Sequence, residues 1–311
     1  MSEKIIKTGP KSTNFKTYIS CKDYLVSGEQ FDLLLDDTLD LLMTNPKPEA
    51  KKLASYYKSE NYISHTDSKK SLLDRVYQRV RSYTLKKKLK LINSFHTEEK
   101  NILDIGAGTG DFLKTCAENG WSVNGVEPNK TARNIAAKKA IHNGGLFFES
   151  IDELKKEENA FLSFDVITMW HVLEHVPNLD ETIFNLKKLL KPEGVLIVAV
   201  PNFKSFDAAY YKEFWAAYDV PRHLWHFSQT AIRRLFFFQA MEVIQTLPMK
   251  FDSFYVSLLS EKNKTKKMKF LNAFFIGLRS NLKAKKTNEY SSLIYVIKNT
   301  KNWLKDGFNG V

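Results

Sequence analysis

The chain has 311 residues, of which 43% are hydrophobic and 26% are charged, and its formal net charge is +12. This length can hold one or two domains with a sizeable core, and the composition is that of an ordinary globular protein. The first residues contain no apolar signal segment, and no run of about 18 apolar residues predicts a membrane span. Two cysteines, Cys21 and Cys116, are too few for a disulfide framework or a zinc site, which favours a reducing, cytoplasmic location.

The positive charge comes largely from lysine-rich stretches at 86–88, 264–269 and 283–286. Such stretches attract nucleic acid, an anionic membrane surface or an acidic substrate. The simpler alternative is that these lysines lie on solvated helix faces and in a loop, so charge alone does not select a partner.

Residues 1–68 have weak periodicity and are predicted to form an accessory segment. A short hairpin is expected within 24–40. Two prolines in the stretch 44–48 exclude a helix and predict a turn. Helices are expected at 49–58 and 69–95, the second because apolar residues recur along it at roughly helical spacing.

The main domain is predicted to span 69–311, and from residue 101 onward short apolar stretches alternate with stretches of helical periodicity. This alternation predicts an α/β fold with a mostly parallel sheet and helices on both faces. The expected strands are 101–105, 121–126, 145–149, 164–170, 194–200, 241–248 and 291–298. The expected helices are 110–119, 129–142, 151–157, 179–191 and 228–239, and a basic amphipathic insertion occupies 258–288.

Residues 101–110 read NILDIGAGTG and are the most informative segment of the chain. A buried strand that ends in Gly106, Gly108 and Gly110 before a helix is typical of nucleotide binding. Glycine lets the backbone approach the ligand, and the helix N-terminus offers free N–H groups. The dinucleotide fingerprint G-x-G-x-x-G would place glycine where this chain has Asp111, which disfavours a nicotinamide-dependent dehydrogenase.

Glu127 follows the second expected strand, where the ribose of a bound nucleotide lies in sheets of this kind. Its carboxylate can accept hydrogen bonds from both ribose hydroxyls. Asn129 is a good cap for the helix that comes next. The alternative is a surface acid at a strand end, but the nearby glycine turn favours ribose binding.

His171, Glu174 and His175 follow the fourth expected strand. The two histidines are four residues apart and share a helical face, which would suit a metal ion. No further ligand is placed nearby in the sequence, so no metal site is predicted. His175 is instead expected to cap or pack beneath a ligand.

Aromatic residues are concentrated in the stretch 203–227, directly after the fifth expected strand. A loop of this composition at the carboxyl end of a strand is suited to form a substrate pocket or lid. The candidate catalytic residues in it are His223, His226 and Tyr210, with the imidazoles able to exchange protons near neutral pH. The alternative is that the histidines only hold the loop together.

Taken together, these motifs resemble those of the class I S-adenosylmethionine-dependent methyltransferases, over about residues 70–300. The segment DVPRHLWHF at 219–227 resembles a block that follows the fifth strand in one bacterial small-molecule branch. The resemblance implies a Rossmann-like seven-stranded sheet whose last strand is antiparallel. The other matching motifs are DIGAGTG at 104–110, VEPN at 126–129, FDVITMWHVLEHV at 164–176 and LLKPEGVLIVAVPN at 189–202.

The resemblance also implies a site for S-adenosylmethionine. The methionine part would lie over the glycine turn, the ribose on Glu127, and the adenine near the third and fourth strands. Asp104 would support the turn, and Trp170 and His171 would border the sulfonium. The expected cofactor-binding residues are Asp104, Gly106, Ala107, Gly108, Gly110, Glu127, Pro128, Trp170 and His171.

The N-terminal segment is similar to that of relatives in which a cysteine-rich zinc knuckle precedes a TNPxP turn. The turn is present at 44–48, but Asp36 and Leu39 stand where cysteines are expected. The resemblance therefore implies a degenerate knuckle that binds no zinc.

The function implied is methyl transfer to a small-molecule or lipid-linked acceptor, in which the enzyme mainly aligns donor and acceptor and excludes water. A nucleic-acid methyltransferase is an alternative, but the chain has no separate RNA-binding signature and no base-flipping motif after the fourth strand. A non-catalytic interaction module with the same fold is a second alternative. The acceptor, the atom methylated and the homo-oligomeric state stay open.

Within the insertion, an apolar stripe on one helical face is flanked by lysines at both ends. Such a helix could lie on an anionic membrane surface and bring a lipid-linked acceptor to the site. It could equally cover the sheet edge or close a dimer. The stripe consists of Phe270, Leu271, Phe274, Phe275 and Leu278.

Overall fold

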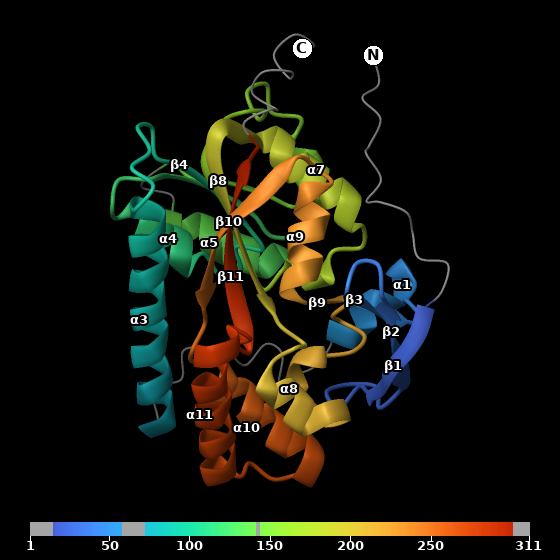
Figure 1. The fold of residues 1–311 in the computed structure, drawn as a ribbon. Helices are drawn as coiled ribbons and strands as arrows, with labels where there is room; N and C mark the ends of the chain where they lie inside the picture. The colour runs from blue at the N-terminus through green and yellow to red at the C-terminus, as the bar shows by residue number, and fades with distance from the viewer. Residues whose placement is uncertain (1–14, 58–71, 141–143, 301–311) are drawn as a thin grey trace.

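The computed structural model describes residues 15–57, 72–140 and 144–300. Two β-sheets organise this part of the chain, a main sheet flanked by helices and a smaller accessory sheet beside it (Figure 1). In these ranges, none of the helices has the length and apolar character needed to cross a membrane.

The main sheet confirms the predicted fold class. Its seven strands within the described residues are β4 (Asn101–Ile105), β5 (Ser122–Val126), β6 (Leu146–Phe148), β7 (Phe164–Trp170), β8 (Leu190–Pro201), β10 (Met241–Pro248) and β11 (Ser292–Asn299). Their order is β10-β11-β8-β7-β4-β5-β6. The pairings from β8 to β6 are parallel, and β11 runs antiparallel to both of its neighbours, so the predicted antiparallel last strand is confirmed.

Helices cover both faces of the main sheet. On one face lie α3 (Leu72–Asn93), α4 (Asp111–Ala117) and α5 (Lys130–Ala140), and on the other lie α6 (Ile151–Leu154), α7 (Leu179–Leu189) and α9 (Gln229–Phe237). Alternate residues of β8 bury on opposite sides: Leu196 and Val198 join the cluster under α7 and α9, whereas Ile197 joins the cluster under α3 and α4. This two-sided burial explains why the strands are almost continuously apolar.

The accessory sheet consists of β1 (Phe15–Lys22), β2 (Gln30–Asp36), β3 (Leu41–Asn45) and β9 (Trp225–Phe227), in that order. All of its pairings are antiparallel, and β9 comes from the aromatic stretch 203–227, far along the chain. The hairpin predicted within 24–40 is therefore wrong in its limits, because β2 pairs with both β1 and β3. The sheet joins the N-terminal segment to a loop that follows β8.

The turn predicted at 44–48 is present, since β3 ends at Asn45 and two short helical turns follow, α1 (Ala50–Leu53) and η1 (Ala54–Tyr57). Position 58 of the expected helix and positions 69–71 before α3 lie outside the described residues. Asp36 and Leu39 build the β2–β3 turn. The Asp36 carboxylate accepts hydrogen bonds from two backbone N–H groups, at 2.9 and 3.0 Å, and Leu39 is buried. The zinc-knuckle resemblance stays a prediction.

The aromatic stretch continues directly from β8. β8 begins at Leu190, which pairs with Phe164 of β7, so the helix expected at 179–191 ends two residues earlier than predicted. After β8 come α8 (Phe206–Tyr211), η4 (Lys212–Phe214) and η5 (Ala216–Tyr218), and a further short turn, η3 (Leu173–His175), follows β7.

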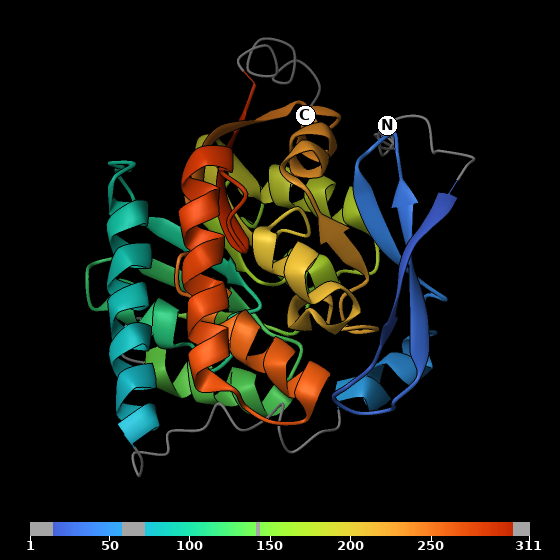
Figure 2. The same ribbon diagram turned by 60° about the horizontal axis from the view of Figure 1, so that its bottom comes forward.

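The basic insertion forms two helices between β10 and β11, which lie side by side (Figure 2). They are α10 (Asp252–Thr265) and α11 (Phe270–Thr287), so the insertion begins at Asp252 and not at 258. They pack closely, because a Cβ on Gly277 would come 2.8 Å from the Phe254 ring. The apolar stripe of α11 consequently points outward, with 77% of Leu271 and 61% of Phe275 exposed. The expectation that the stripe covers the sheet edge is wrong within the described chain.

Candidate active site

The glycine turn lies between β4 and α4 and has the backbone conformation that glycine favours. Gly106, Gly108 and Gly110 have φ angles of 74°, 55° and 77°, all in the left-handed region. A Cβ on Gly106 would come 2.4 Å from Val172, and one on Gly110 would come 2.7 Å from Ala136. A Cβ on Gly108 would meet nothing within 4 Å. Gly106 and Gly110 thus allow other parts of the protein to pack closely against the turn, whereas Gly108 faces open space where a ligand can approach.

Glu127 is tied directly to this turn. Its Oε2 accepts a hydrogen bond of 2.8 Å from the Gly108 N–H, and its Oε1 accepts one of 2.8 Å from the Asn129 N–H. The Asn129 side chain caps α5 by accepting from the Ala132 N–H, as predicted. Each carboxylate oxygen can accept a second hydrogen bond, so Glu127 can hold the turn and also bind hydroxyl groups.

The remaining expected cofactor residues frame the turn. The Ala107 N–H donates to Val126 O at 3.0 Å. Arg133 donates to the carbonyl oxygens of Glu127 and Pro128 and thereby fixes the segment after β5.

Asp104 is buried under the turn at the end of β4. It accepts a hydrogen bond of 2.5 Å from the Thr168 hydroxyl of β7. Burial raises the pKa of Asp104 to about 7, although Thr168 and Lys88 act in the opposite direction.

Asp111, which stands where the dinucleotide fingerprint has its third glycine, has a structural role in this fold. Its carboxylate binds Lys139 of α5 at 2.8 Å and also Arg81 of α3. The residue therefore pins the start of α4 to two other helices, and its negative charge suits the first turn of a helix.

Trp170 ends β7 and packs edge-on against Phe112. The Lys88 ammonium lies 4.0 Å from the centre of its ring, and burial lowers the pKa of that lysine to about 8. Lys88 was not among the residues predicted from the sequence. Its position is detectable in principle, because it shares a helical face with Leu85 and Ile92, which pack in the core.

His171 follows Trp170 in a left-handed conformation, with φ of 57°. Its Nδ1 lies 3.3 Å from Glu174 Oε1, and its Nε2 lies 3.2 Å from Asp252 Oδ2 at the start of α10. Burial disfavours the charged ring, but the two carboxylates prevail and raise the pKa of His171 to about 10. Val172 beside it packs against Gly106, so this segment adjoins the glycine turn.

His175 and His223 come together although they are far apart in the chain. Their ring centres are 4.6 Å apart, at the carboxyl ends of β7 and β8. His175 Nδ1 lies 3.0 Å from Arg222 O, and His223 Nδ1 lies 2.9 Å from Ala217 O. Burial, with the neighbouring His175 and His226, holds the pKa of His223 well below its usual value, so its imidazole is neutral.

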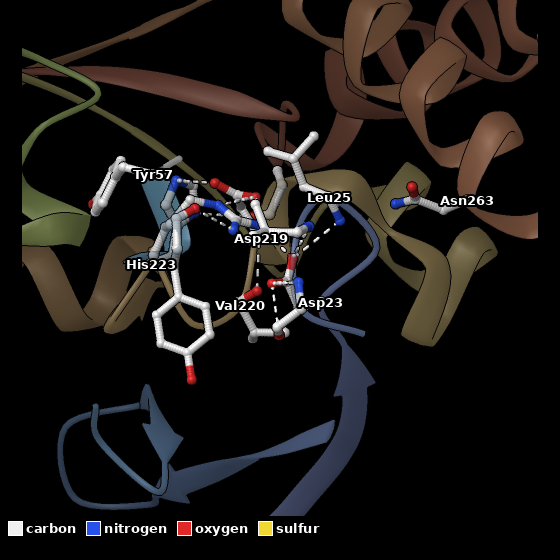
Figure 3. Close-up of polar contacts among 12 residues, drawn as sticks. Asp23, Leu25, Tyr57, Asp219, Val220, His223 and Asn263 are labelled. Carbon is white, nitrogen blue, oxygen red and sulfur yellow. Dashed lines mark hydrogen bonds and ion pairs between the residues drawn. The ribbon is translucent and has the colours of Figure 1, made fainter. Parts of the chain in front are cut away.

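Arg222 holds the loop that carries His223. Its buried guanidinium donates to Asp23 Oδ1 at 2.9 Å, to Asp219 Oδ1 at 2.7 Å and to Tyr56 O at 3.0 Å. Figure 3 shows Asp23, Asp219 and His223 gathered around this network, with Tyr57 close by. This link was not predicted from the sequence, because Asp23 and Tyr56 belong to the N-terminal segment, far from Arg222 along the chain.

The other two candidate catalytic residues have different surroundings. His226 Nε2 lies 3.1 Å from the Thr44 hydroxyl, whose own proton goes to His223 O, so the ring donates to Thr44. Burial lowers the pKa of His226 to about 3. Tyr210 is 38% exposed on α8, and its ring contacts Phe206, Tyr211 and Lys264. The described contacts thus bring His223 to the site but leave His226 as a link between the two sheets.

The order of the main sheet and the glycine turn together define the class I methyltransferase fold. A solved structure with this fold is magnesium protoporphyrin IX methyltransferase from Synechocystis with bound SAH, which has a TM-score of 0.53, 14% identity, and coverage of 81% of this chain and 100% of that one. A family model described as a methyltransferase domain matches residues 77–240. The chain belongs to this methyltransferase domain family.

Curated relatives include ubiquinone biosynthesis O-methyltransferases. The protein of Haemophilus ducreyi is 34% identical over 108 residues, which are 33% of this chain and 46% of that protein. The protein of Rickettsia akari is 27% identical over 157 residues, which are 50% of this chain and 61% of that protein. The chain thus matches about half the length of these relatives.

Proposed function

We propose that this chain transfers a methyl group from S-adenosylmethionine to a small-molecule or lipid-linked acceptor. The observation that carries the proposal is the open side of Gly108 beside the Glu127 carboxylate. The methyltransferase family supports the proposal, as does the bound SAH of the Synechocystis protein. The donor would place its methionine part over the turn, its ribose on Glu127 and its sulfonium near Trp170 and His171.

The acceptor would lie at the carboxyl ends of β7 and β8, where open α/β sheets bind their ligands. Val172 packs against Gly106, which puts the segment 171–175 next to the proposed donor site. The neutral imidazole of His223 would orient the acceptor or take its proton, and Tyr210 would form part of the outer wall. The names of the curated relatives support a small-molecule acceptor.

The exposed face of α11 would contact an anionic lipid surface. Apolar side chains point outward along it, and exposed cations flank them on both helices of the insertion and on the connection between them. An apolar face bordered by positive charge complements anionic headgroups over a hydrocarbon layer. The cations are Lys262, Lys264, Lys266, Lys267, Lys269, Arg279, Lys283, Lys285 and Lys286.

A cytoplasmic location is part of the proposal. Cys21 and Cys116 are both free and buried, and burial raises the pKa of each thiol, as suits a chain whose cysteines stay reduced.

Calorimetry with S-adenosylhomocysteine tests the donor assignment directly. The purified protein should bind one equivalent, whereas NAD⁺ at the same concentration should give no binding heat. Binding of NAD⁺, or of neither ligand, would contradict the proposal.

A further inference from the structure

Glu174, His175 and His223 form a compact group at the edge of the proposed acceptor site. One ligand atom of each lies within 4.8 Å of one on both of the others. Glu174 is 1% exposed, and neither of its carboxylate oxygens accepts a hydrogen bond from the part of the chain that the structure describes. An ionised carboxylate buried in this way is costly unless a cation or donors satisfy it.

His171 supplies only part of what this carboxylate needs. The His171 ring lies 3.3 Å from Glu174 Oε1 without a hydrogen-bond geometry, and its other nitrogen is turned to Asp252. Asp219, whose Oδ1 is paired with Arg222, presents its second carboxylate oxygen 4.0 Å from His223 Nε2 as one more acceptor. The group therefore has more acceptor capacity than the described donors fill.

The hydrogen bonds of the two histidines fix which ring nitrogens hold a lone pair. A carbonyl oxygen only accepts, so His223 Nδ1, which lies 2.9 Å from Ala217 O, carries a proton. His175 Nδ1 lies 3.0 Å from Arg222 O and 3.1 Å from the Tyr57 hydroxyl. The shorter contact, to the carbonyl, assigns the proton to His175 Nδ1, and the Tyr57 oxygen can accept from the same N–H. With the proton on Nδ1, it is Nε2 of each imidazole that can offer a lone pair to a metal ion. Histidines that ligate metals show this arrangement, with one nitrogen donating to a backbone carbonyl and the other free to bind the ion.

The loop that carries His223 is also rigid enough to preserve such a site. Arg222, whose carbonyl anchors His175, is itself held by Asp23, Asp219 and Tyr56 O. The positions of the His175 and His223 rings are thus set by protein contacts and do not require a bound ion.

We propose that Glu174, His175 and His223 bind one divalent transition-metal cation of the zinc type. Two imidazoles and one carboxylate suit Zn²⁺, Co²⁺ or Fe²⁺, whereas Mg²⁺ and Ca²⁺ prefer oxygen ligands throughout. Three protein ligands leave a coordination position open, as in catalytic sites. If the proposed function holds, an acceptor oxygen can occupy that position, and His223 then acts on the acceptor through the cation.

Cobalt binding to the metal-stripped protein tests the site without donor, acceptor or turnover. The folded wild-type chain should take up one equivalent of Co²⁺ with visible absorption bands of low-symmetry coordination, and Zn²⁺ should displace it. Mg²⁺ in excess should not displace the bound Co²⁺. Wild-type protein that stays folded and binds no Co²⁺ overturns the proposal.

Variants then locate the ion. Glu174→Gln and His223→Gln should each weaken Co²⁺ binding by about 100-fold or more, whereas the matched control His226→Gln should keep it, because His226 bonds to Thr44. Circular dichroism confirms that each variant is folded. Equal Co²⁺ affinity in all of them would mean a different site and would refute the assignment. The same variants should still bind S-adenosylhomocysteine. If they do, a failure of the metal proposal leaves the proposed methyl transfer intact, so the two proposals can fail independently.

Discussion

Gly108 and Glu127 are joined by one hydrogen bond and contribute differently to the proposed donor site. Glu127 offers a carboxylate that can bind the donor, and Gly108 leaves open space for it, so substitutions can test the two contributions separately. Glu127→Ala should lower the affinity for S-adenosylhomocysteine about 10- to 100-fold, because charge-assisted hydrogen bonds of roughly 1.5–3 kcal/mol are lost. Glu127→Gln is the control, since its amide keeps one acceptor oxygen and should bind with intermediate affinity. Calorimetry measures all three proteins, and equal affinities would remove Glu127 from the site.

Gly108→Val tests the contribution of the open space at Gly108. The new side chain would project into space that is open in the protein and that the donor would fill, so binding should be lost. Gly120→Val is the matched control, because Gly120 also has a positive φ and open space around its Cβ. Both variants should lose about 1–2 kcal/mol of stability through backbone strain, but only Gly108→Val should lose the donor. Loss of binding in both variants would point to misfolding instead.

Asp104 makes stability depend on pH. Its carboxyl is protonated up to about pH 7 in the folded protein, while in the unfolded chain it ionises near pH 4. The folded state therefore holds more protons between these values, and stability falls as the pH rises from about 4 to 7. Asp104→Asn should flatten this part of the profile by at most about 4 kcal/mol. Denaturation at a series of pH values measures it, with the exposed Asp37→Asn as a control for lost charge.

At the scale of elements, Arg222 joins the N-terminal segment to the loop after β8. Arg222→Met would leave Asp23 buried without its cation, and the free energy of unfolding should fall by about 3–5 kcal/mol. The exposed ion pair of Lys52 and Glu29 offers a contrast, and Lys52→Ala should leave the free energy of unfolding nearly unchanged. Urea titration compares the two. Similar losses would mean that the buried pair does not hold the two parts together.

The α11 face gives a prediction about surfaces. Leu271→Ser and Phe275→Ser should leave the melting temperature unchanged, because both side chains are exposed, and should reduce binding to anionic vesicles at low salt. Phe237→Ser on α9 is the control, since it removes an aromatic side chain that is 70% exposed elsewhere. Co-sedimentation with phosphatidylglycerol and with phosphatidylcholine vesicles measures the effect. If the wild-type chain stays in the supernatant with both, α11 does not bind membranes.

At the scale of the whole molecule, the main sheet was predictable because its strands are buried on both faces. β1 was not, since most of its residues are exposed and it carries no strand-like apolar signal. β9 is only three residues long inside an aromatic stretch, and its pairing with β3 joins distant parts of the chain.

In the candidate site too, only the residues that lie close together along the chain could be predicted as a group. The glycine turn and Glu127 are separated by one helix and one strand and were found together. Glu174 and His223 meet only because two loops converge at the carboxyl ends of β7 and β8, which no spacing rule reveals.

The closing of the accessory sheet has a consequence for how the chain is made. β3 ends at Asn45, but its partner β9 begins at Trp225, so about 180 residues must be synthesised before that edge is paired. At ordinary translation rates this takes roughly 10–40 s. During that time the edge of β3 stays unpaired near the ribosome and can pair with another nascent chain. The accessory sheet, although three of its strands are synthesised before the main sheet, is thus completed only after most of the main sheet has been made.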